Sequence, residues 1–373
     1  MRYYIIAGEA SGDMHGANLM KELKRQHVNA VFRCWGGDRM QQAGGEIVKH
    51  YRELAFMGFT EVVMNLGTIL KNISFCKKDI LEWKPDAVIL IDYPGFNLRI
   101  AEFAHAQKLK VIYYISPQVW AWKQSRVQKI KKLVDQMLVI LPFEREFYKK
   151  FDYEVEYVGH PLLDEINGAL NTSSRDEWKS KNGLSDKRII ALLPGSRMQE
   201  INKMLPLMLS AVSRFPDYQF AVSAAPSADK AAIEKICSGF PVKIIFSDSY
   251  SLLKNSFAAL VTSGTATLET ALFGVPQVVC YKGGTISYLI ARQLVDVKFI
   301  SLVNLIMEKE VVKELIQNQL TGKNLKTELE KILSEETRRK ILAQYSELRT
   351  RLGGAGASER AAQKIAAFLG DRK

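Results

Sequence analysis

Three turns in the sequence combine glycine with side chains that bind anions or move protons. The first, Gly8-Glu9-Ala10-Ser11-Gly12-Asp13, follows an apolar segment and precedes a helical pattern. Glycine permits a tight turn, and the N–H groups of a helix start can bind an anion. The spacing matches no dinucleotide or Walker loop, so an ordinary strand–helix turn is about as good an interpretation. Glu9, Ser11 and Asp13 are the candidate residues of this turn.

The second turn is Leu193-Pro194-Gly195-Ser196-Arg197. A guanidinium offers a planar pair of donors to phosphate oxygens, and a serine hydroxyl adds one more. We therefore assign Ser196 and Arg197 to a phosphate-binding site. A surface ion pair is the alternative role for Arg197.

The third turn spans residues 262–269 and is rich in small and hydroxylated residues. Gly264 and Thr265 could present helix-start N–H groups to a diphosphate. Glu269, one turn into the helix, could accept both hydrogen bonds of a ribose diol. The same residues also suit an ordinary capped helix, and the two interpretations are compatible.

Asp92 ends the apolar segment 87–91 and precedes Tyr93-Pro94-Gly95-Phe96-Asn97. A carboxylate at the tip of a buried strand is partly desolvated, which suits a general base. Asp92 could instead cap the following helix, but Asn97 is better placed for that.

Two further segments could contact a sugar phosphate. Ser116, Gln118 and Trp120 lie in an aromatic and amide-rich stretch, and sugars bind to such flat faces with hydrogen-bonding neighbours. Core packing explains the tryptophan nearly as well. His160, in Gly159-His160-Pro161, could donate to a phosphate, although a turn histidine without such a role is commoner.

These residues need strands that end beside one another. Apolar segments alternate with helical patterns along the chain, which predicts parallel sheets with right-handed crossovers. The predicted strands are 3–7, 31–35, 87–92, 111–115, 136–140, 155–158, 189–193, 219–223, 242–246, 258–262 and 277–281. A polar stretch, 163–187, is interpreted as a linker. We therefore expect an α/β fold of two doubly wound, Rossmann-like domains that face a cleft, with ligands at the carboxyl ends of the strands.

The expected domain limits follow from this pattern. Residues 1–165 form the first domain and residues 166–345 the second. Residues 346–373 hold a C-terminal helix that returns to the first domain.

The composition favours an anionic partner. The 373 residues include 52 basic and 40 acidic side chains, a net charge of +12. Because no RNA-binding signature or long basic tail is present, a phosphorylated substrate or an anionic membrane surface fits at least as well as nucleic acid. A basic surface that only confers solubility is a serious alternative. The four cysteines and five histidines have no metal-ligand spacing, so we expect no metal. No signal peptide or membrane span is evident, which favours the cytoplasm.

One predicted helix, 61–82, carries an apolar stripe that should mostly be core: Val62, Leu66, Ile69, Ile73, Cys76 and Ile80. Val63 and Leu70 lie off this stripe.

Taken in order, the motifs resemble the lipid A disaccharide synthase family. They are AGEASGD at 7–13, IDYPGFN at 91–97, SPQVWAWK at 116–123, LPFE at 141–144, GHP at 159–161, LLPGSR at 192–197, SGTATLE at 263–269 and SLVNL at 301–305. The resemblance implies the GT-B fold and inverting transfer without cofactor or metal. The donor would be UDP-2,3-diacylglucosamine, the acceptor 2,3-diacylglucosamine 1-phosphate (lipid X), and the products a lipid A disaccharide 1-phosphate and UDP.

The resemblance also assigns roles. Asp92 would be the base, and Ser196, Arg197, Gly264, Thr265, Glu269 and Asn304 would form the UDP site. Glu9, Ser11, Asp13, Ser116, Gln118, Trp120 and His160 would line the acceptor side. Gly95 replaces a second acid found in many relatives, which leaves Asp92 as the only local carboxylate in the sequence. Met57, Phe59, Val63, Leu66 and Leu70 would meet acyl chains or the inner face of the inner membrane, with core packing as an equal alternative. A homodimer is possible.

Three other functions stay open. A UDP-sugar 2-epimerase would share the donor site, but its additional acids and histidines are not evident. A non-catalytic nucleotide-binding scaffold would bind UDP without turnover. A nucleic-acid binder would show strongly salt-dependent binding.

Overall fold

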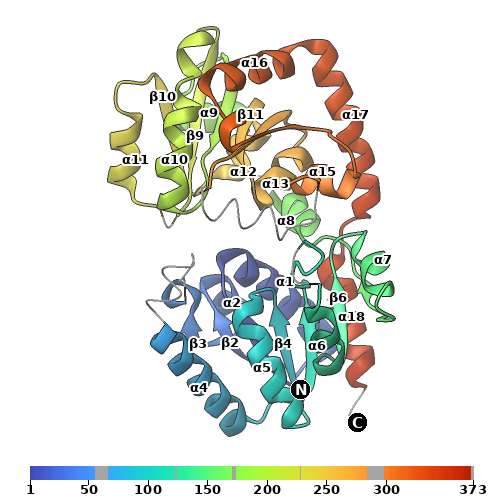
Figure 1. The fold of residues 1–373 in the computed structure, drawn as a ribbon. Helices are drawn as coiled ribbons and strands as arrows, with labels where there is room; N and C mark the ends of the chain where they lie inside the picture. The colour runs from blue at the N-terminus through green and yellow to red at the C-terminus, as the bar shows by residue number, and fades with distance from the viewer. Residues whose placement is uncertain (55–65, 122–123, 170–173, 227, 284–297, 371–373) are drawn as a thin grey trace. The chain divides into compact units, whose positions relative to one another are not determined.

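The computed structural model describes residues 1–54, 66–121, 124–169, 174–226, 228–283 and 298–370. The chain divides into two compact units (Figure 1). Unit 1 comprises Met1–Pro161 and Ala355–Lys373, and unit 2 comprises Leu162–Gly354. Each unit holds one parallel sheet with helices packed on it, so the prediction of two doubly wound, Rossmann-like domains is confirmed.

Unit 1 is built on a seven-stranded sheet with the order β3-β2-β1-β4-β5-β6-β7. Ile5 of β1 lies between Cys34 of β2 and Ile89 of β4, and all three side chains are fully buried. Such apolar central strands are expected where helices cover both faces of a parallel sheet. The strands are β1 (Arg2–Ala7), β2 (Val31–Gly36), β3 (Glu46–His50), β4 (Ala87–Ile91), β5 (Lys110–Tyr114), β6 (Gln136–Val139) and β7 (Glu156–Tyr157).

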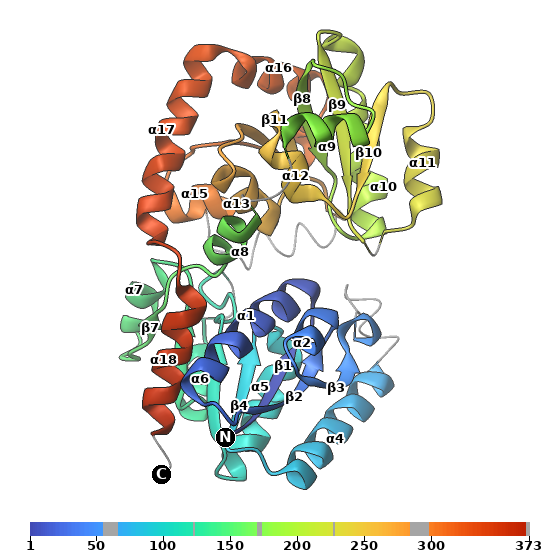
Figure 2. The same cartoon turned by 180° about the vertical axis from the view of Figure 1, so that it is seen from behind.

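The helices of unit 1 include one from the C-terminal end of the chain. They are α1 (Ala10–Gln26), α2 (Asp38–Gln42), the 3-10 turn η1 (Tyr51–Glu53), α4 (Leu66–Trp83), α5 (Pro94–Ala106), α6 (Arg126–Leu133), α7 (Glu144–Lys149) and α18 (Ala357–Leu369). Helix α18 packs beside α1 and β6 (Figure 2). Its Arg360 donates from Nε to the Val158 carbonyl at 2.8 Å, so the C-terminal helix is tied to the end of the last strand.

Unit 2 is built on a six-stranded sheet with the order β10-β9-β8-β11-β12-β13. Its strands are β8 (Arg188–Leu193), β9 (Tyr218–Ala224), β10 (Val242–Phe246), β11 (Ser256–Thr262), β12 (Gln277–Tyr281) and β13 (Lys313–Ile316). Its helices are α8 (Leu162–Ala169), α9 (Arg175–Lys181), α10 (Met198–Leu209), η2 (Val212–Arg214), α11 (Lys230–Cys237), α12 (Ser249–Lys254), α13 (Thr265–Leu272), α15 (Leu302–Met307), η3 (Gln317–Gln319), α16 (Gly322–Leu333) and α17 (Glu335–Leu352).

The linker predicted at 163–187 is wrong, because this stretch contains helices α8 and α9. Ser174 caps α9 by accepting a hydrogen bond from the Glu177 N–H. Trp178 is buried, and its indole N–H donates to Asp248 at 2.6 Å. The polar residues of this stretch therefore form the solvated faces of helices, and α9 is attached to unit 2 through the buried Trp178.

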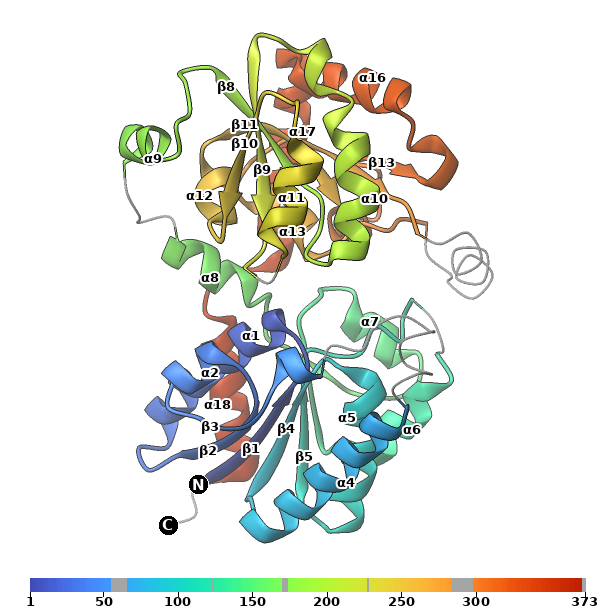
Figure 3. The ribbon, with the colours of Figure 1, turned by 90° about the vertical axis from the view of Figure 1, so that its left-hand side faces the viewer.

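The apolar stripe of α4 is core in only part of the helix, which runs along the sheet of unit 1 beside α5 (Figure 3). Ile73, Cys76 and Ile80 are buried, whereas Leu66 is 47% exposed and Leu70 is 51% exposed. The buried part is anchored by Asp79, which accepts hydrogen bonds from Tyr4 and Arg33. The N-terminal turns of α4 therefore carry leucines that the core does not cover.

Candidate active site

Several of the candidate residues lie at the topological switch points of the two sheets. In unit 1, strand order reverses between β1 and β4, and in unit 2 between β8 and β11. Ligands of doubly wound sheets bind outside the carboxyl ends of the strands at this point. Glu9 and Asp92 follow the two central strands of unit 1, and Gly195 and Gly264 follow those of unit 2.

The backbone at Asp92 is held in an uncommon conformation. Asp92 and Tyr93 both have left-handed backbones, with φ of 45° and 48°, and Ile115 on the neighbouring loop has φ of 66°. Residues other than glycine rarely adopt this region, and such strain is retained where the surroundings over-determine it. Here the Asp92 N–H donates to the Ile115 carbonyl at 3.2 Å.

Two side chains complete the restraint on Asp92. Its carbonyl oxygen accepts from the Tyr113 hydroxyl at 2.6 Å and from the Asn97 amide at 2.7 Å. On the other side, the ring of Tyr93 lies against the backbone of Gly8, where a Cβ would sit 2.4 Å from the ring. The backbone of Asp92 is therefore held in its left-handed conformation by contacts from Tyr113 on β5 and Asn97 on α5.

Asn97 is buried inside α5 and is not the cap of this helix, so that prediction is wrong. The helix begins at Pro94 after the left-handed Tyr93, and proline is well suited to the first helical position. The Asn97 amide also donates to the Ile91 carbonyl at 3.2 Å. Its function in the fold is to tie α5 to the end of β4.

The carboxyl of Asp92 lies in an environment that disfavours its charge. The pKa of Asp92 is raised to about 6, mainly by burial and further by the nearby Glu9 carboxylate, while the hydrogen bond from the Tyr93 N–H favours the charged form. Asp92 is the only carboxylate in its own stretch of sequence, but in the fold Glu9, which follows the adjacent strand, is a second one nearby. Gly95 is exposed, and a Cβ there would meet no atom within 4 Å. A carboxyl with a pKa near 6 is ionised at neutral pH and is a stronger base than an ordinary aspartate.

Unit 1 also holds a buried glutamate. Glu144, at the start of α7, accepts from the Leu141 N–H at 2.8 Å and the Ile140 N–H at 3.1 Å. Burial raises the pKa of Glu144 to about 7, although these N–H groups, Ser116 and Trp120 favour the charged form. Ser116 is buried and shares a hydrogen bond of 2.5 Å with the Tyr148 hydroxyl. Trp120 is also buried, whereas Gln118 is exposed.

Two other acceptor-side candidates are buried. Burial, helped by the nearby His15, lowers the pKa of His160 to about 3, so its imidazole is neutral at physiological pH. A neutral imidazole with so low a pKa is a poor base but still carries an N–H donor. Asp13 accepts backbone N–H groups of Gly37, Arg39 and Met40, which start helix α2. Ser11 is half-buried in the first turn of α1.

In unit 2, the β8–α10 turn exposes its polar groups. Gly195 has φ of 110°, and a Cβ there would lie 2.5 Å from a carboxylate oxygen of Glu200. Ser196 is exposed, and Arg197, at the N-cap of α10, is 48% exposed. Arg197 lies 3.8 Å from Glu200, an exposed pair that contributes little stability. Glycine is therefore needed to make a turn that presents Ser196 and Arg197 to solvent.

The start of α13 forms the neighbouring edge of the same sheet. Gly264 and Thr265 are exposed, while the Thr267 hydroxyl donates to the Gly264 carbonyl at 2.8 Å. One turn later, burial raises the pKa of Glu269 to about 7; the Tyr250 hydroxyl lowers it and Glu165 raises it. The exposed start of α13 and the half-buried carboxyl of Glu269 are therefore one helix turn apart.

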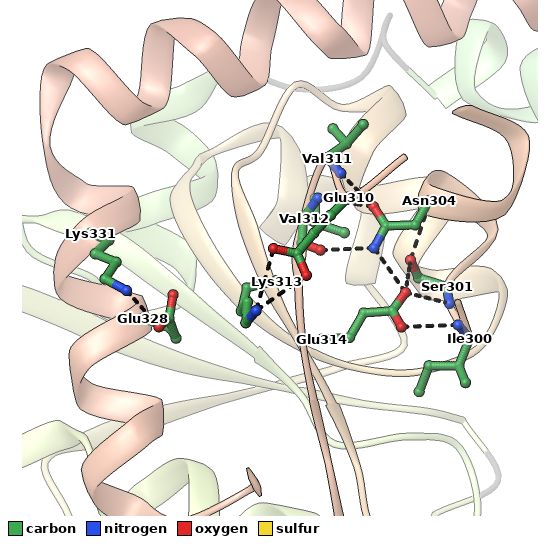
Figure 4. Close-up of polar contacts among 10 residues, drawn as sticks. All are labelled: Ile300, Ser301, Asn304, Glu310, Val311, Val312, Lys313, Glu314, Glu328 and Lys331. Carbon is green, nitrogen blue, oxygen red and sulfur yellow. Dashed lines mark hydrogen bonds and ion pairs between the residues drawn. The ribbon is translucent and has the colours of Figure 1, made fainter. Parts of the chain in front are cut away.

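Asn304 is fully buried in α15, and Figure 4 shows its amide surrounded by backbone and by Glu314. Its Oδ1 accepts from the Val311 and Val312 N–H groups, and its Nδ2 donates to the Val312 carbonyl and to Glu314. All the hydrogen-bonding groups of this side chain are thus engaged within unit 2.

Three of the acyl-contact candidates, Met57, Phe59 and Val63, lie outside the described residues. Leu66 and Leu70 are described and exposed.

Glu144, Tyr250, Glu165 and Glu314 are not among the site residues predicted from the sequence. The LPFE motif contains Glu144 and could have flagged it. The other three gain their surroundings only from tertiary packing.

Comparisons with known proteins are consistent along the whole chain. A model of the family described as lipid-A-disaccharide synthetase matches residues 3–368. The lipid-A-disaccharide synthase of Syntrophus aciditrophicus is 43% identical over 367 residues, covering 96% of this chain and 95% of that protein. That of Geobacter metallireducens is 39% identical, covering 100% of this chain and 98% of that protein.

A solved structure with the same fold is UDP-GlcNAc 2-epimerase from Neisseria meningitidis bound to UDP-GlcNAc. Its TM-score is 0.70 at 12% identity, and 98% of this chain and 99% of that one are covered. At this identity the likeness shows the fold and not the reaction. The family match and the full-length relatives decide the assignment: the chain belongs to the lipid-A-disaccharide synthetase family and is a glycosyltransferase of the GT-B fold.

Proposed function

We propose that this chain transfers a 2,3-diacylglucosamine unit from UDP to the 6-hydroxyl of 2,3-diacylglucosamine 1-phosphate. The products are a β-1,6-linked disaccharide 1-phosphate and UDP. The relatives named lipid-A-disaccharide synthase support this reaction, and a structure of the same fold that holds UDP-GlcNAc supports a UDP-sugar donor. The observation that carries the proposal is the Asp92 carboxyl, held by a strained backbone at a switch point with a raised pKa of about 6.

In this mechanism Asp92 accepts the proton of the acceptor hydroxyl as its oxygen attacks the anomeric carbon from the face opposite UDP. The carbon–oxygen bond to UDP breaks, and negative charge develops on the diphosphate. Arg197, Ser196 and the N–H groups at the start of α13 stabilise that charge. Glu269 accepts hydrogen bonds from the ribose. The inverted anomeric configuration follows from a single displacement.

The acceptor side of the proposal uses unit 1. Glu9 and Ser11 follow β1, and Ser116, Gln118 and Trp120 follow β5, so they lie at the same sheet edge as Asp92. His160, being neutral, is assigned a hydrogen-bond donor role toward the acceptor phosphate and not a base. The Asp13 carboxylate acts through α2, since it holds the backbone that starts this helix.

We also propose that the enzyme works at the anionic inner face of the inner membrane. Within the described ranges, no helix has both the length and the apolar character needed to cross a bilayer. The exposed Leu66 and Leu70 on α4 and the net charge of +12 suit contact with an anionic surface. A homodimer remains a prediction.

The test is UDP release by purified protein with UDP-2,3-diacylglucosamine, with and without lipid X. The proposal expects release that depends on lipid X and formation of a disaccharide 1-phosphate in equal amount. An epimerase would instead interconvert the donor at C2 without acceptor. A scaffold protein would bind UDP with no turnover. Either result would contradict the proposed reaction.

A further inference from the structure

A carboxylate that is almost entirely buried in unit 2 is connected to the proposed donor site by hydrogen bonds. Glu314, on the edge strand β13, is 7% exposed. It accepts from the Ile300 N–H at 3.0 Å, the Ser301 N–H at 2.9 Å, the Ser301 hydroxyl at 2.7 Å and the Asn304 amide at 2.9 Å (Figure 4). Among the described residues no lysine or arginine pairs with it. Uncharged donors therefore hold this carboxylate in place.

These contacts fix the backbone that enters helix α15. Ser301 is the N-cap of this helix, and its hydroxyl accepts the Asn304 N–H while donating to Glu314. Asn304 closes the network by binding Val311 and Val312, which precede β13. Since each polar group is satisfied by another member, the network favours one loop conformation.

One member of the network reaches the proposed donor site. The Ser263 hydroxyl donates to the Ile300 carbonyl at 3.0 Å, while the Ile300 N–H is held by Glu314. Ser263 immediately precedes Gly264 and Thr265, whose N–H groups are proposed to bind the diphosphate. Helices α13 and α15 also pack against each other. A continuous path of hydrogen bonds therefore runs from Glu314 through Ile300 to the turn that starts α13.

We infer that Glu314 is a positioning residue for the UDP site, acting through Ile300 and Ser263 on the start of α13. This inference rests on the proposed donor site. It also gives Asn304 an indirect role, because the amide of Asn304 is already fully engaged in the network and orients Glu314.

The sharpest substitution is Glu314→Gln, which preserves shape. A glutamine oxygen can still accept from Ser301 and Asn304, but its NH₂ group would face the Ile300 N–H, donor against donor. The expected result is a roughly tenfold weaker affinity for UDP and a matching rise in donor KM, about 1.4 kcal/mol by the affinity relation. The KM for lipid X should stay unchanged. A merely structural role would affect stability without this separation of the two KM values.

Ser263→Ala is the second variant, because loss of one half-buried hydroxyl is compatible with folding. Ser263→Ala should also weaken UDP binding, as Glu314→Gln does. Since both substitutions break one path, the double variant should bind UDP no more weakly than the worse single variant. Glu310→Gln is the matched control. Glu310 is 54% exposed, lies near β13 and pairs with Lys313 at 3.2 Å, so UDP affinity should not change.

Calorimetric titration with UDP gives a readout that does not need turnover. Wild-type affinity in both Glu314→Gln and Ser263→Ala, or full additivity in the double variant, would overturn the inference. If the wild-type protein binds UDP but never forms disaccharide, the proposed reaction is wrong. The inference about Glu314 is then still tested by the UDP titration.

Discussion

Asp92→Asn should make the protein more stable, because the charge of Asp92 is disfavoured in the folded state, and it should strongly reduce activity, because the proposed base is lost. The pKa of Asp92 rises from 3.8 to about 6, roughly 2 units, and each unit corresponds to about 1.4 kcal/mol. The ceiling is therefore about 3 kcal/mol. Because the side chain is partly in contact with water, we expect about 1–2 kcal/mol, or a rise in Tm of roughly 3–6 °C for a unit of this size.

The pH dependence of this gain has a definite sign. Below pH 3.8 Asp92 is protonated in both the folded and unfolded chain, so the substitution changes nothing there. Between 3.8 and about 6 the unfolded chain ionises first, and folding of the wild type loses stability. Above about pH 6 the difference is complete and constant. The activity of the wild type should fall as pH drops through about 6, since the base is then protonated.

Thermal and urea melts of wild type and Asp92→Asn between pH 4 and 8 measure the difference. Asp217→Asn, at an exposed position near β9, is the control for an aspartate without these surroundings. The reasoning is refuted if Asp92→Asn is no more stable than wild type at pH 7.5, or if its gain persists unchanged at pH 4.

Three other variants test separate parts of the molecule. Gly8→Ala would place a Cβ 2.4 Å from the ring of Tyr93, so we expect a loss of about 1–3 kcal/mol in unfolding free energy and at least a tenfold lower kcat; a normal melt with normal kcat contradicts this. Arg197→Lys keeps the charge but loses the planar fork, so donor KM should rise about tenfold with lipid X KM unchanged, and an unchanged donor KM argues against the phosphate role. Leu66→Ser combined with Leu70→Ser should leave stability within about 0.5 kcal/mol but reduce sedimentation with anionic vesicles, and undiminished sedimentation excludes this surface.

The edge of the sheet that carries Asp92 was predictable because parallel strands end together. An apolar strand followed by an acid was enough to place Asp92 there. The approach of Glu9 was not predictable from spacing along the chain, because 83 positions separate two residues that the β1–β4 pairing brings together.

The error at Asn97 came from weighing the capping preference of asparagine above that of proline. Two consecutive left-handed residues, Asp92 and Tyr93, turn the chain at once, so the helix starts at Pro94. Such a strained pair is stabilised by tertiary contacts from Tyr113 and Asn97, which no local pattern contains.

Strands β3 and β13 were not predicted because both lie at sheet edges and carry charged residues. In β13 the buried Glu314 gains its partners from the loop at Ile300 and Ser301, and strand propensity does not encode such contacts. Conversely, Leu66 was predicted to be a core residue of α4, but it is exposed, because only the later turns of this helix are buried. Periodicity identifies an apolar face but not what covers it.

The central claim is that Asp92 accepts the proton of the acceptor hydroxyl. The most direct measurement is single-turnover UDP release from UDP-2,3-diacylglucosamine with lipid X, for wild type and Asp92→Asn, with UDP binding measured on the same samples. We predict a rate lower by roughly 10²–10⁴-fold in the variant and unchanged UDP affinity. A variant that turns over within about threefold of wild type would contradict the assignment.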